Sequence, residues 1–333
     1  MKIKCTRIQE FNKPLMVKNI DIETPSSESV MVKVKFSGIN FYEKLLIEGK
    51  YPTSASLPLT IGGEFSGEIV EIGENVKDFK IGDRVFSLAL SGKGTSGGFA
   101  SFANIESKYL YHLPDDFTFE QGASIPMIFF TAYTILSKKI NIKDGQTVLI
   151  HSVAGGVGST LVKLIKAMYP NSTIIGTYSS VEKEKFIKDL GVDIPICSEN
   201  IDFMTEINNN FPEGLDVIFD PVGQKLVTEH LNLIKPLSGI WCTYGAYSGP
   251  IIEENLVGKI RNKNATLVGF LMWPLIENKI WCQQEFEEIF DLIRQYKIQP
   301  QIDKIFPIDE INQAFSRMSD RKNIGKILIK CSE

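Results

Sequence analysis

Alternation of apolar and polar side chains marks the first third of the chain as rich in β-structure. From Val30 to Phe36 every second side chain is apolar, which predicts a strand with one buried face. Two further segments, at residues 69–73 and 83–86, are set off by glycines and predict short strands. Residues 91–98 are mostly glycine and serine, and we expect either a mobile lid or a passive surface loop there.

Helical and strand-like segments begin to alternate near residue 119. The first helix is expected at residues 119–137, with Pro126 as an interruption. Further strands are expected at residues 147–150, 173–177, 217–220 and 239–244, and a closing strand at 326–330. Further helices are expected at residues 159–168, 181–190, 229–234, 284–296 and 308–318. Alternating strands and helices predict a parallel sheet with helices on both faces.

These patterns predict an α/β protein of two domains, in agreement with a length of 333 residues. A Rossmann domain, built on a doubly wound parallel sheet, is expected at residues 123–257. A β-rich domain is expected to be formed by residues 1–122 together with residues 258–333. The Rossmann domain is therefore an insertion in the sequence of the β-rich domain.

Composition narrows the possible functional classes. The net charge of −4 predicts no nucleic-acid-binding surface, and no apolar run of 18 residues is present to span a bilayer. The five cysteines are scattered and never form a CxxC pair, which favours the cytoplasm over a compartment that forms disulfides. His112, His151 and His230 are each isolated, so we expect no metal site and interpret His151 as a packing or turn residue.

The segment that says most about function is the glycine cluster that follows the apolar run 148–150. Val153 precedes Ala154-Gly155-Gly156-Val157-Gly158, after which helix-forming residues begin. A dinucleotide-binding turn needs this order of strand, tight turn and helix. Gly155 lets the backbone approach a pyrophosphate, Gly158 lets the helix pack on the strand, and the helix amides face the phosphates. Because Val153 replaces the first glycine of GxGxxG, an ordinary glycine-rich turn is the alternative.

The second strand of a Rossmann domain ends at the residue that distinguishes NAD from NADP. Residues 174–180 carry no acid at that end, whereas Ser180 and Lys183 offer a hydroxyl and an ammonium group. Charge-assisted hydrogen bonds of this kind to a 2′-phosphate contribute roughly 1.5–3 kcal/mol each. We therefore expect NADPH to be the cofactor. The alternative for Lys183 is a solvated position at a charged helix start.

Several short sequence motifs, spread in order along the whole chain, match those of one protein family. They are Gly38-Ile39-Asn40-Phe41, Gly49-Lys50-Tyr51-Pro52, residues 61–67, Gly82-Asp83-Arg84-Val85, Thr131-Ala132-Tyr133, residues 154–158, residues 219–223 and residues 322–326. On these motifs the chain resembles the zinc-free quinone oxidoreductase branch of the medium-chain dehydrogenase/reductase superfamily. Within that branch it resembles the synaptic vesicle membrane protein (vesicle amine transport protein) homologues. The resemblance implies that the β-rich domain is GroES-like.

The resemblance also implies site residues. Asn40 and Gly63 stand where zinc enzymes carry Cys and His, and Asn40 is expected either to donate a hydrogen bond to the acceptor or to stabilise its turn. Tyr51 either lines the pocket or packs before Pro52, and Leu45 replaces a tyrosine of some relatives. Cofactor contacts are implied for Thr131, Ala154, Gly155, Gly156, Val157, Gly158, Gly176, Ser180, Lys183, Ser198, Val222, Tyr244, Gly245, Phe270, Leu271 and Lys326, the last of these towards the 2′-phosphate.

Quinones and enones accept a hydride from a nicotinamide readily, so they need no metal. The sequence therefore predicts an NADPH-dependent reductase of quinones or α,β-unsaturated carbonyl compounds. An enoyl-thioester reductase and a lipid-binding or membrane-trafficking protein that keeps an NADPH-binding fold are the alternatives. The apolar residues 270–276 are expected in a cleft or a subunit contact rather than on a membrane, because they lack a basic face. A homodimer is expected, with residues 239–244 and the apolar segment that follows at its boundary.

Overall fold

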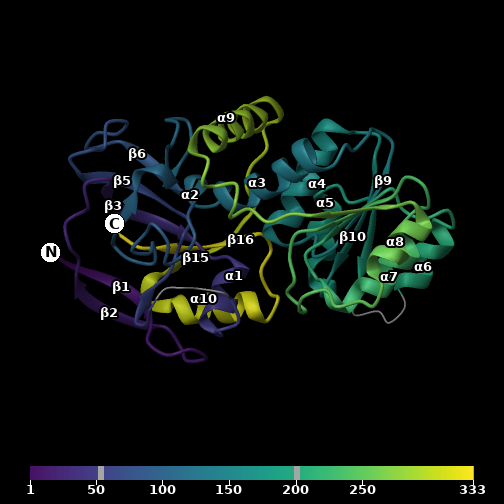
Figure 1. The fold of residues 1–333 in the computed structure, drawn as a ribbon, viewed down its shortest axis with the longest axis horizontal. Coiled ribbons are helices and arrows are strands. Elements are labelled where there is room, and N and C mark those ends of the chain that lie inside the picture. Colours follow the sequence, from purple (N-terminus) through teal and green to yellow (C-terminus); the bar gives the residue numbers. More distant parts are fainter. Residues whose placement is uncertain (52–55, 199–202, 333) are drawn as a thin grey trace. The chain divides into compact units, whose positions relative to one another are not determined.

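The computed structural model describes residues 1–51, 56–198 and 203–332. The chain forms two compact units, whose elements are labelled in Figure 1. The first unit comprises Met1–Phe130, Trp273–Asp291 and Gln299–Glu333, and the second comprises Thr131–Met272 and Leu292–Ile298. These units are groups of residues in mutual contact, and the domain boundaries that we expected from the sequence stay a prediction.

The first unit is a β-structure of two sheets. A seven-stranded sheet has the order β15-β16-β3-β5-β6-β8, with β7 also paired to β3, and a three-stranded sheet has the order β2-β1-β4. Its strands are β1 (Lys2–Ile8), β2 (Met16–Asp21), β3 (Ser29–Gly38), β4 (Leu59–Thr60), β5 (Phe65–Ile72), β6 (Arg84–Ser87), β7 (Phe102–Glu106), β8 (Leu110–His112), β15 (Ile302–Pro307) and β16 (Lys326–Lys330).

Short helices cover this β-structure. They are α1 (Phe41–Ile47), η1 (Ser107–Tyr109), α2 (Phe119–Gly122), η5 (Ile308–Glu310) and α10 (Ile311–Ser319), while α3 (Ile125–Thr134) and α9 (Lys279–Tyr296) have residues in both units. The helix expected at residues 119–137 is divided into α2, α3 and the π-helix η2 (Ile135–Lys139). The break falls before Pro126, which occupies the first turn of α3, where its missing N–H group leaves no hydrogen bond unmade.

Strand β3 is the centre of the larger sheet and explains the alternation in the sequence. Val30, Val32 and Val34 are fully buried, as the pattern predicted. The intervening Met31 is also buried, and β3 is paired along its whole length with β5, β7 and β16. The strand that the sequence predicted as half-buried is therefore covered on both faces at its start.

The second unit is a doubly wound α/β domain, so the predicted fold class is confirmed. Its six parallel strands have the order β11-β10-β9-β12-β13-β14. They are β9 (Thr147–Ile150), β10 (Thr173–Tyr178), β11 (Ile194–Cys197), β12 (Val217–Asp220), β13 (Ile240–Thr243) and β14 (Thr266–Gly269). The helices are α4 (Gly156–Met168), η3 (Val181–Lys183), α5 (Glu184–Asp189), α6 (Phe203–Asn210), η4 (Gln224–Leu226), α7 (Val227–Leu233) and α8 (Leu256–Lys263).

Helices lie on both faces of this sheet (Figure 1). On one face α6, α7 and α8 enclose a core that includes Leu149, Ile218 and the fully buried Trp241. On the other face α4 buries Leu161 and Ile165. The apolar strand segments are covered from both sides, which is why β9 and β12 read as continuous apolar runs rather than as alternating ones.

The order of the strands corrects the boundary that we expected for a homodimer. Strand β13 lies between β12 and β14, so all its pairing positions are used within the unit. The edges of the sheet are β11 and β14, and β14 is a strand that the sequence analysis missed and whose Thr266 and Leu267 are exposed. A sheet that continued into a second copy would have to do so through one of these two strands. The homodimer itself stays a prediction.

The loop at residues 91–98 is held to the first unit at several points. The N–H of Glu106 donates to the carbonyl of Gly94, and the N–H of Ser96 donates to that of Asn104. Gly94 and Gly97 have positive φ angles, and an added Cβ atom would meet Tyr109 or the Thr60 backbone. Of the two alternatives for this loop, the structure favours the passive connection over the lid.

Candidate functional site

The glycine turn of the second unit has the geometry of an anion-binding helix start. Helix α4 begins at Gly156, with Gly155 as an N-cap residue that has no capping side chain, and its first turn holds no acidic residue. The first amides of an α-helix have no partner inside the helix, and the helix dipole favours a negative charge beside them. Gly155, Gly156 and Val157 remain partly exposed, so a ligand can reach these amides.

Gly158 has a structural task in the same turn. A Cβ atom added to Gly158 would lie 2.5 Å from the carbonyl oxygen of Ser152 and 2.8 Å from the Cα atom of Val153. Both are backbone atoms that no side-chain rotation can move aside. Gly158 therefore allows the start of α4 to pack closely against the turn that follows β9. At Gly155 the same Cβ atom would meet only the Ser152 oxygen, at 3.2 Å.

The departure from the fingerprint at Val153 is matched by Gly176 in β10. An added Cβ atom at Gly176 would lie 3.0 Å from one methyl group of Val153 and 3.1 Å from the other. Val153 is fully buried, and its N–H donates to the carbonyl of Thr177 at 3.0 Å. Gly176 therefore makes room for the side chain of Val153, a packing role beside the cofactor contact that the resemblance implies.

The end of β10, where we expected a 2′-phosphate, contains an acid as well as the predicted groups. Lys183 lies in η3 and is only 7% exposed, so the alternative of a solvated lysine is wrong. Ser180 is partly exposed, and its hydroxyl donates to the exposed carboxylate of Glu182. That hydrogen bond lowers the pKa of Glu182 below its usual range. The sequence analysis looked for an acid on the strand and interpreted Glu182, which follows it, only as part of a charged helix start.

Among the remaining predicted cofactor residues of the second unit, Thr131 lies in α3 and the others follow the ends of strands. Thr131 and Tyr244 are partly exposed, whereas Ala154, Val222 and Phe270 are buried. The N–H of Val222 donates to the Asp220 carboxylate at 2.7 Å, so this amide already has a partner. Ser198 is exposed and donates to the carbonyl of Tyr178 at 2.9 Å, Leu271 is 59% exposed, and Gly245 packs against the backbone of Pro221.

The two histidines of the second unit are not isolated, which corrects the sequence analysis. His151 and His230 are buried, with their Nε2 atoms 2.9 Å apart. The Nδ1 atom of His151 lies 2.8 Å from the Thr177 hydroxyl, and the Nδ1 atom of His230 lies 3.5 Å from the Asp220 carboxylate. Burial lowers the pKa of His151 to about 3 and the pKa of His230 well below its usual range, the latter also because His151 is near. Both rings are therefore neutral at pH 7 and act in packing, as we expected for His151.

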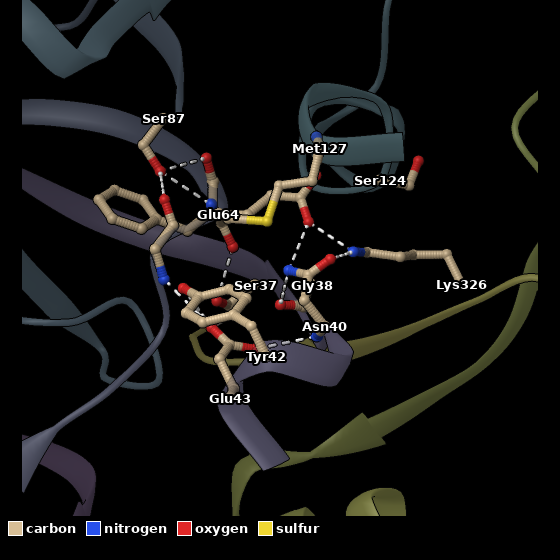
Figure 2. A network of polar contacts seen from close by, with 12 residues as sticks. Ser37, Gly38, Asn40, Tyr42, Glu43, Glu64, Ser87, Ser124, Met127 and Lys326 are labelled. Carbon is tan, nitrogen blue, oxygen red and sulfur yellow. Dashed lines mark hydrogen bonds and ion pairs between the residues drawn. The ribbon is translucent and has the colours of Figure 1, made fainter. Parts of the chain in front are cut away.

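In the first unit, Asn40 has partners other than the expected acceptor (Figure 2). Its amide nitrogen donates to Glu64 Oε2 at 3.0 Å and to the carbonyl of Gly38 at 3.4 Å. Its amide oxygen accepts a hydrogen bond from Lys326 Nζ. Both amide hydrogens are thus directed into the unit. Of the two roles considered for Asn40, the structure favours the one that stabilises its own turn.

Lys326 belongs to the same cluster. Its ammonium lies 2.5 Å from Glu64 Oε2, and both side chains are almost completely buried (Figure 2). The other Glu64 oxygen accepts from the N–H of Met127 at 2.7 Å. Because a buried carboxylate needs a countercharge, Glu64 holds Lys326 at this place. This pairing holds the Lys326 ammonium within the first unit, and the contact with a 2′-phosphate that we expected for Lys326 stays a prediction.

A second acid, Glu43, lies at the start of α1 beside this cluster. Its Oε2 atom accepts from the N–H of Asn40 at 2.9 Å, and its Oε1 atom accepts from the N–H of Gly63 at 3.3 Å. Complete burial raises the pKa of Glu43 to about 7, although these amides and Lys326 oppose the rise. The sequence analysis missed Glu43, although an acid three residues after Asn40 is a common sign of a helix start.

Tyr42 connects Glu43 to a group of aromatic rings. Its hydroxyl donates to Glu43 Oε1 at 3.2 Å and lies 2.9 Å from the Ser91 hydroxyl. Its ring lies 5.5 Å from that of Tyr51 and 5.0 Å from that of Trp273. The Trp273 N–H donates to the Tyr51 hydroxyl, so Tyr51 packs among aromatic rings. Its following residues, 52–55, lie outside the described part of the chain.

Neither a metal-binding cluster nor a membrane-spanning helix is found among the described residues. No three His, Cys, Asp or Glu side chains gather there in a way that suits a metal ion. None of the helices in the described ranges combines the length and the apolar character that crossing a bilayer requires.

Comparisons with known proteins agree with this architecture. The alcohol dehydrogenase GroES-like domain matches residues 26–115, and the zinc-binding dehydrogenase family matches residues 190–329. The synaptic vesicle membrane protein VAT-1 homolog of Danio rerio is 32% identical over 324 residues, which are 91% of this chain and 64% of that relative. The chain thus spans less than two thirds of that relative's length.

Two further matches extend over almost all of the chain. The quinone oxidoreductase-like protein 2 homolog of Nematostella vectensis is 31% identical over 339 residues, covering 99% of this chain and 89% of the relative. The crystal structure of Escherichia coli quinone oxidoreductase complexed with NADPH aligns with a TM-score of 0.88 at 24% identity, covering 98% of this chain and 99% of that one. The last likeness concerns the fold.

Proposed function

Because the chain belongs to the quinone oxidoreductase family of the medium-chain dehydrogenase/reductase superfamily, we propose that it is an NADPH-dependent reductase of quinones or α,β-unsaturated carbonyl compounds. The glycine turn at the start of α4 carries this proposal. Its uncapped amides, its freedom from acidic side chains and its exposure fit a pyrophosphate. A protein of the same fold carries NADPH in its solved structure.

The residues of the turn would hold the cofactor by its phosphates. The amides of Gly156, Val157 and Gly158 would donate to the pyrophosphate, while Ser180 and Lys183 would meet the 2′-phosphate at the end of β10. The bound dihydronicotinamide supplies the hydride. Thr131, Tyr244, Gly245, Phe270 and Leu271 stay proposed contacts for the nicotinamide half, as the family resemblance implies.

The first unit supports a reaction that needs no zinc. Gly63 has no side chain to bind a metal, and the Asn40 amide is already shared between Glu64 and Lys326. Catalytic zinc sites need three protein ligands of the Cys, His or carboxylate type. Acceptors that are themselves electron-poor, such as quinones and enones, suit an enzyme that stabilises the developing charge by hydrogen bonds alone.

The test separates cofactor binding from turnover. NADPH and NADH binding is measured by fluorescence titration, and NADPH oxidation is then followed with ortho-quinones, para-quinones, enones and enoyl thioesters. We expect binding that favours NADPH and turnover with a quinone or an enone. Tight NADPH binding without turnover on the whole panel would refute the reductase proposal, and turnover confined to enoyl thioesters would assign that reaction instead.

The relationship to a synaptic vesicle membrane protein homolog favours one alternative from another class. A lipid-binding or membrane-trafficking protein that keeps an NADPH-binding fold should float with liposomes. It should also oxidise NADPH negligibly with every acceptor. Flotation without turnover would support this alternative, and turnover without flotation would remove it.

A further inference from the structure

The Asn40 amide does not supply a proton to an acceptor, because an amide N–H is far too weak an acid, and its hydrogens donate within the first unit. Reduction of a carbonyl acceptor nevertheless needs a proton as well as a hydride. We propose that Tyr42, Ser91 and Glu43 form a proton relay in which Tyr42 gives the proton to the acceptor oxygen. This inference rests on the proposed reductase function and names the catalytic acid that the function requires.

The three side chains form a closed set of contacts. The Tyr42 hydroxyl lies 2.9 Å from the Ser91 hydroxyl and 3.2 Å from Glu43 Oε1, and the Ser91 hydroxyl lies 3.4 Å from the same Glu43 oxygen. The N–H of Gly62 donates to the Ser91 oxygen at 2.9 Å, which fixes the serine and leaves its hydrogen for Tyr42 or Glu43. A proton can therefore pass between Glu43 and Tyr42 directly or through Ser91.

Glu43 is suited to store the proton. It is completely buried, and the charged groups that face it are Lys326 from β16 and Glu64, which precedes β5. Burial raises its pKa to about 7, so its protonated and ionised forms are both populated at neutral pH. A general acid works best when its pKa lies near the working pH. The burial also keeps the Tyr42 phenol itself protonated, since its pKa is raised well above the usual value.

We expect an acceptor to meet the relay at Tyr42. Glu43 and Ser91 are buried, whereas Tyr42 keeps part of its surface exposed. Its ring stands among those of Tyr51 and Trp273. Flat conjugated acceptors pack well against aromatic rings, so this group suits a quinone or an enone beside the Tyr42 hydroxyl.

With an enone, a C–H bond forms at the β-carbon with the hydride. The electron pair of the C=C bond then forms the double bond between the α-carbon and the carbonyl carbon, and the pair of the C=O double bond moves to the oxygen, so that protonation there gives the enol. The O–H bond of Tyr42 breaks while an O–H bond forms on that oxygen, and Tyr42 takes the carboxyl proton of Glu43. The Glu43 carboxylate then takes a proton from water. For a quinone, one hydride and one proton likewise give the hydroquinone.

Tyr42→Phe tests the relay because it keeps the ring and removes the hydroxyl. We expect turnover to fall about 100-fold, in line with the loss of a general acid. The NADPH dissociation constant and the unfolding temperature should stay near those of the unmodified chain. Tyr109→Phe is the matched control, since Tyr109 also donates to a carboxylate of the first unit, that of Glu277 at 2.9 Å, and its turnover should be unchanged.

Two further measurements test the relay even if the Tyr42→Phe variant does not fold. Turnover of the unmodified chain should fall as pH rises through about 7, and Glu43→Gln should abolish this dependence. Infrared spectra of the protein without substrate should contain a protonated carboxyl band that titrates near pH 7 and is missing in Glu43→Gln.

The outcomes distinguish the relay from the function on which it rests. If the unmodified chain reduces no acceptor, the reductase function fails and the relay fails with it. If the chain is active and Tyr42→Phe retains its turnover within twofold, only the relay is overturned. A carboxyl band that titrates near pH 4.5 would overturn Glu43 as the proton store.

Discussion

Gly155 and Gly158 stand three residues apart in one turn, yet the structure predicts opposite consequences for their replacement by alanine. At Gly158 the new methyl group would lie 2.5 Å from one backbone atom and 2.8 Å from another. At Gly155 it would meet only one oxygen, at 3.2 Å, and the φ angle of −77° suits alanine. Gly158→Ala should therefore damage the fold, whereas Gly155→Ala should damage the binding of phosphates.

Two terms set the size of the effect at Gly158. Alanine is favoured over glycine inside a helix by up to about 1 kcal/mol. Overpacking against a rigid neighbour costs about 1–3 kcal/mol, and distances as short as these place the cost at the upper end. The net loss should be about 1–2 kcal/mol, equivalent to a fall in Tm of roughly 2–8 °C for a unit of this size. Gly155→Ala should cost less than about 1 kcal/mol, mostly through a poorer N-cap.

Thermal unfolding followed by circular dichroism, together with NADPH fluorescence titration, would separate the two effects. We expect Gly155→Ala to bind NADPH at least about tenfold more weakly while its Tm stays close to that of the unmodified chain. Gly158→Ala should show the lower Tm. If Gly155→Ala is the less stable variant, or if both bind NADPH normally, the turn is not a pyrophosphate site and the reasoning is wrong.

Three further predictions concern charge. Glu182→Gln removes an exposed negative charge beside Ser180, so it should raise the affinity for NADPH relative to NADH about two- to fivefold at low salt. The effect should be smaller at high salt, and titrations with both cofactors at the two salt concentrations would measure it. In the folded chain the pKa of Glu43 is raised from 4.5 to about 7, so the free energy of unfolding should fall by up to about 3 kcal/mol as pH rises from 4.5 to 7. Urea unfolding at several pH values would measure this loss, which Glu43→Gln should lack. The lowered pKa of His151 acts in the opposite sense: stability should be fully present above pH 6.5 and should decline as pH falls towards 3, with NMR finding the ring neutral at pH 5.

The sequence predicted best those elements that are short, apolar and bounded by turn residues. The bounds of β9, β12 and β16 agree with the expected ones for that reason. In the second unit it missed β11, which contains Pro195, and β14, which is mostly exposed. Both are edge strands, and an edge strand tolerates proline. Their residues do not alternate between apolar and polar side chains, and that alternation is the pattern from which a strand is predicted.

The candidate sites divide in the same way. The glycine turn could be predicted because strand, turn and helix are consecutive in the chain. The relay could not, because Ser91 follows Tyr42 by 49 positions and only the packing of the β-structure brings their hydroxyls together. The contact between His151 and His230 joins residues 79 positions apart, so their isolation in the sequence was no guide to their surroundings.

The pairing of Val153 with Gly176 changes how the imperfect fingerprint should be interpreted. The first glycine of the motif normally allows a tight turn, and a valine there should crowd the neighbouring strand. In this chain the neighbouring strand has no side chain at the crowded place, and the methyl groups of Val153 occupy the space that a Cβ atom at Gly176 would enter. The turn keeps its hydrogen bond to Thr177, and the amides at the start of α4 remain accessible. The glycine in the adjacent strand therefore accommodates the valine in the turn, and the helix start keeps the geometry that suits a phosphate.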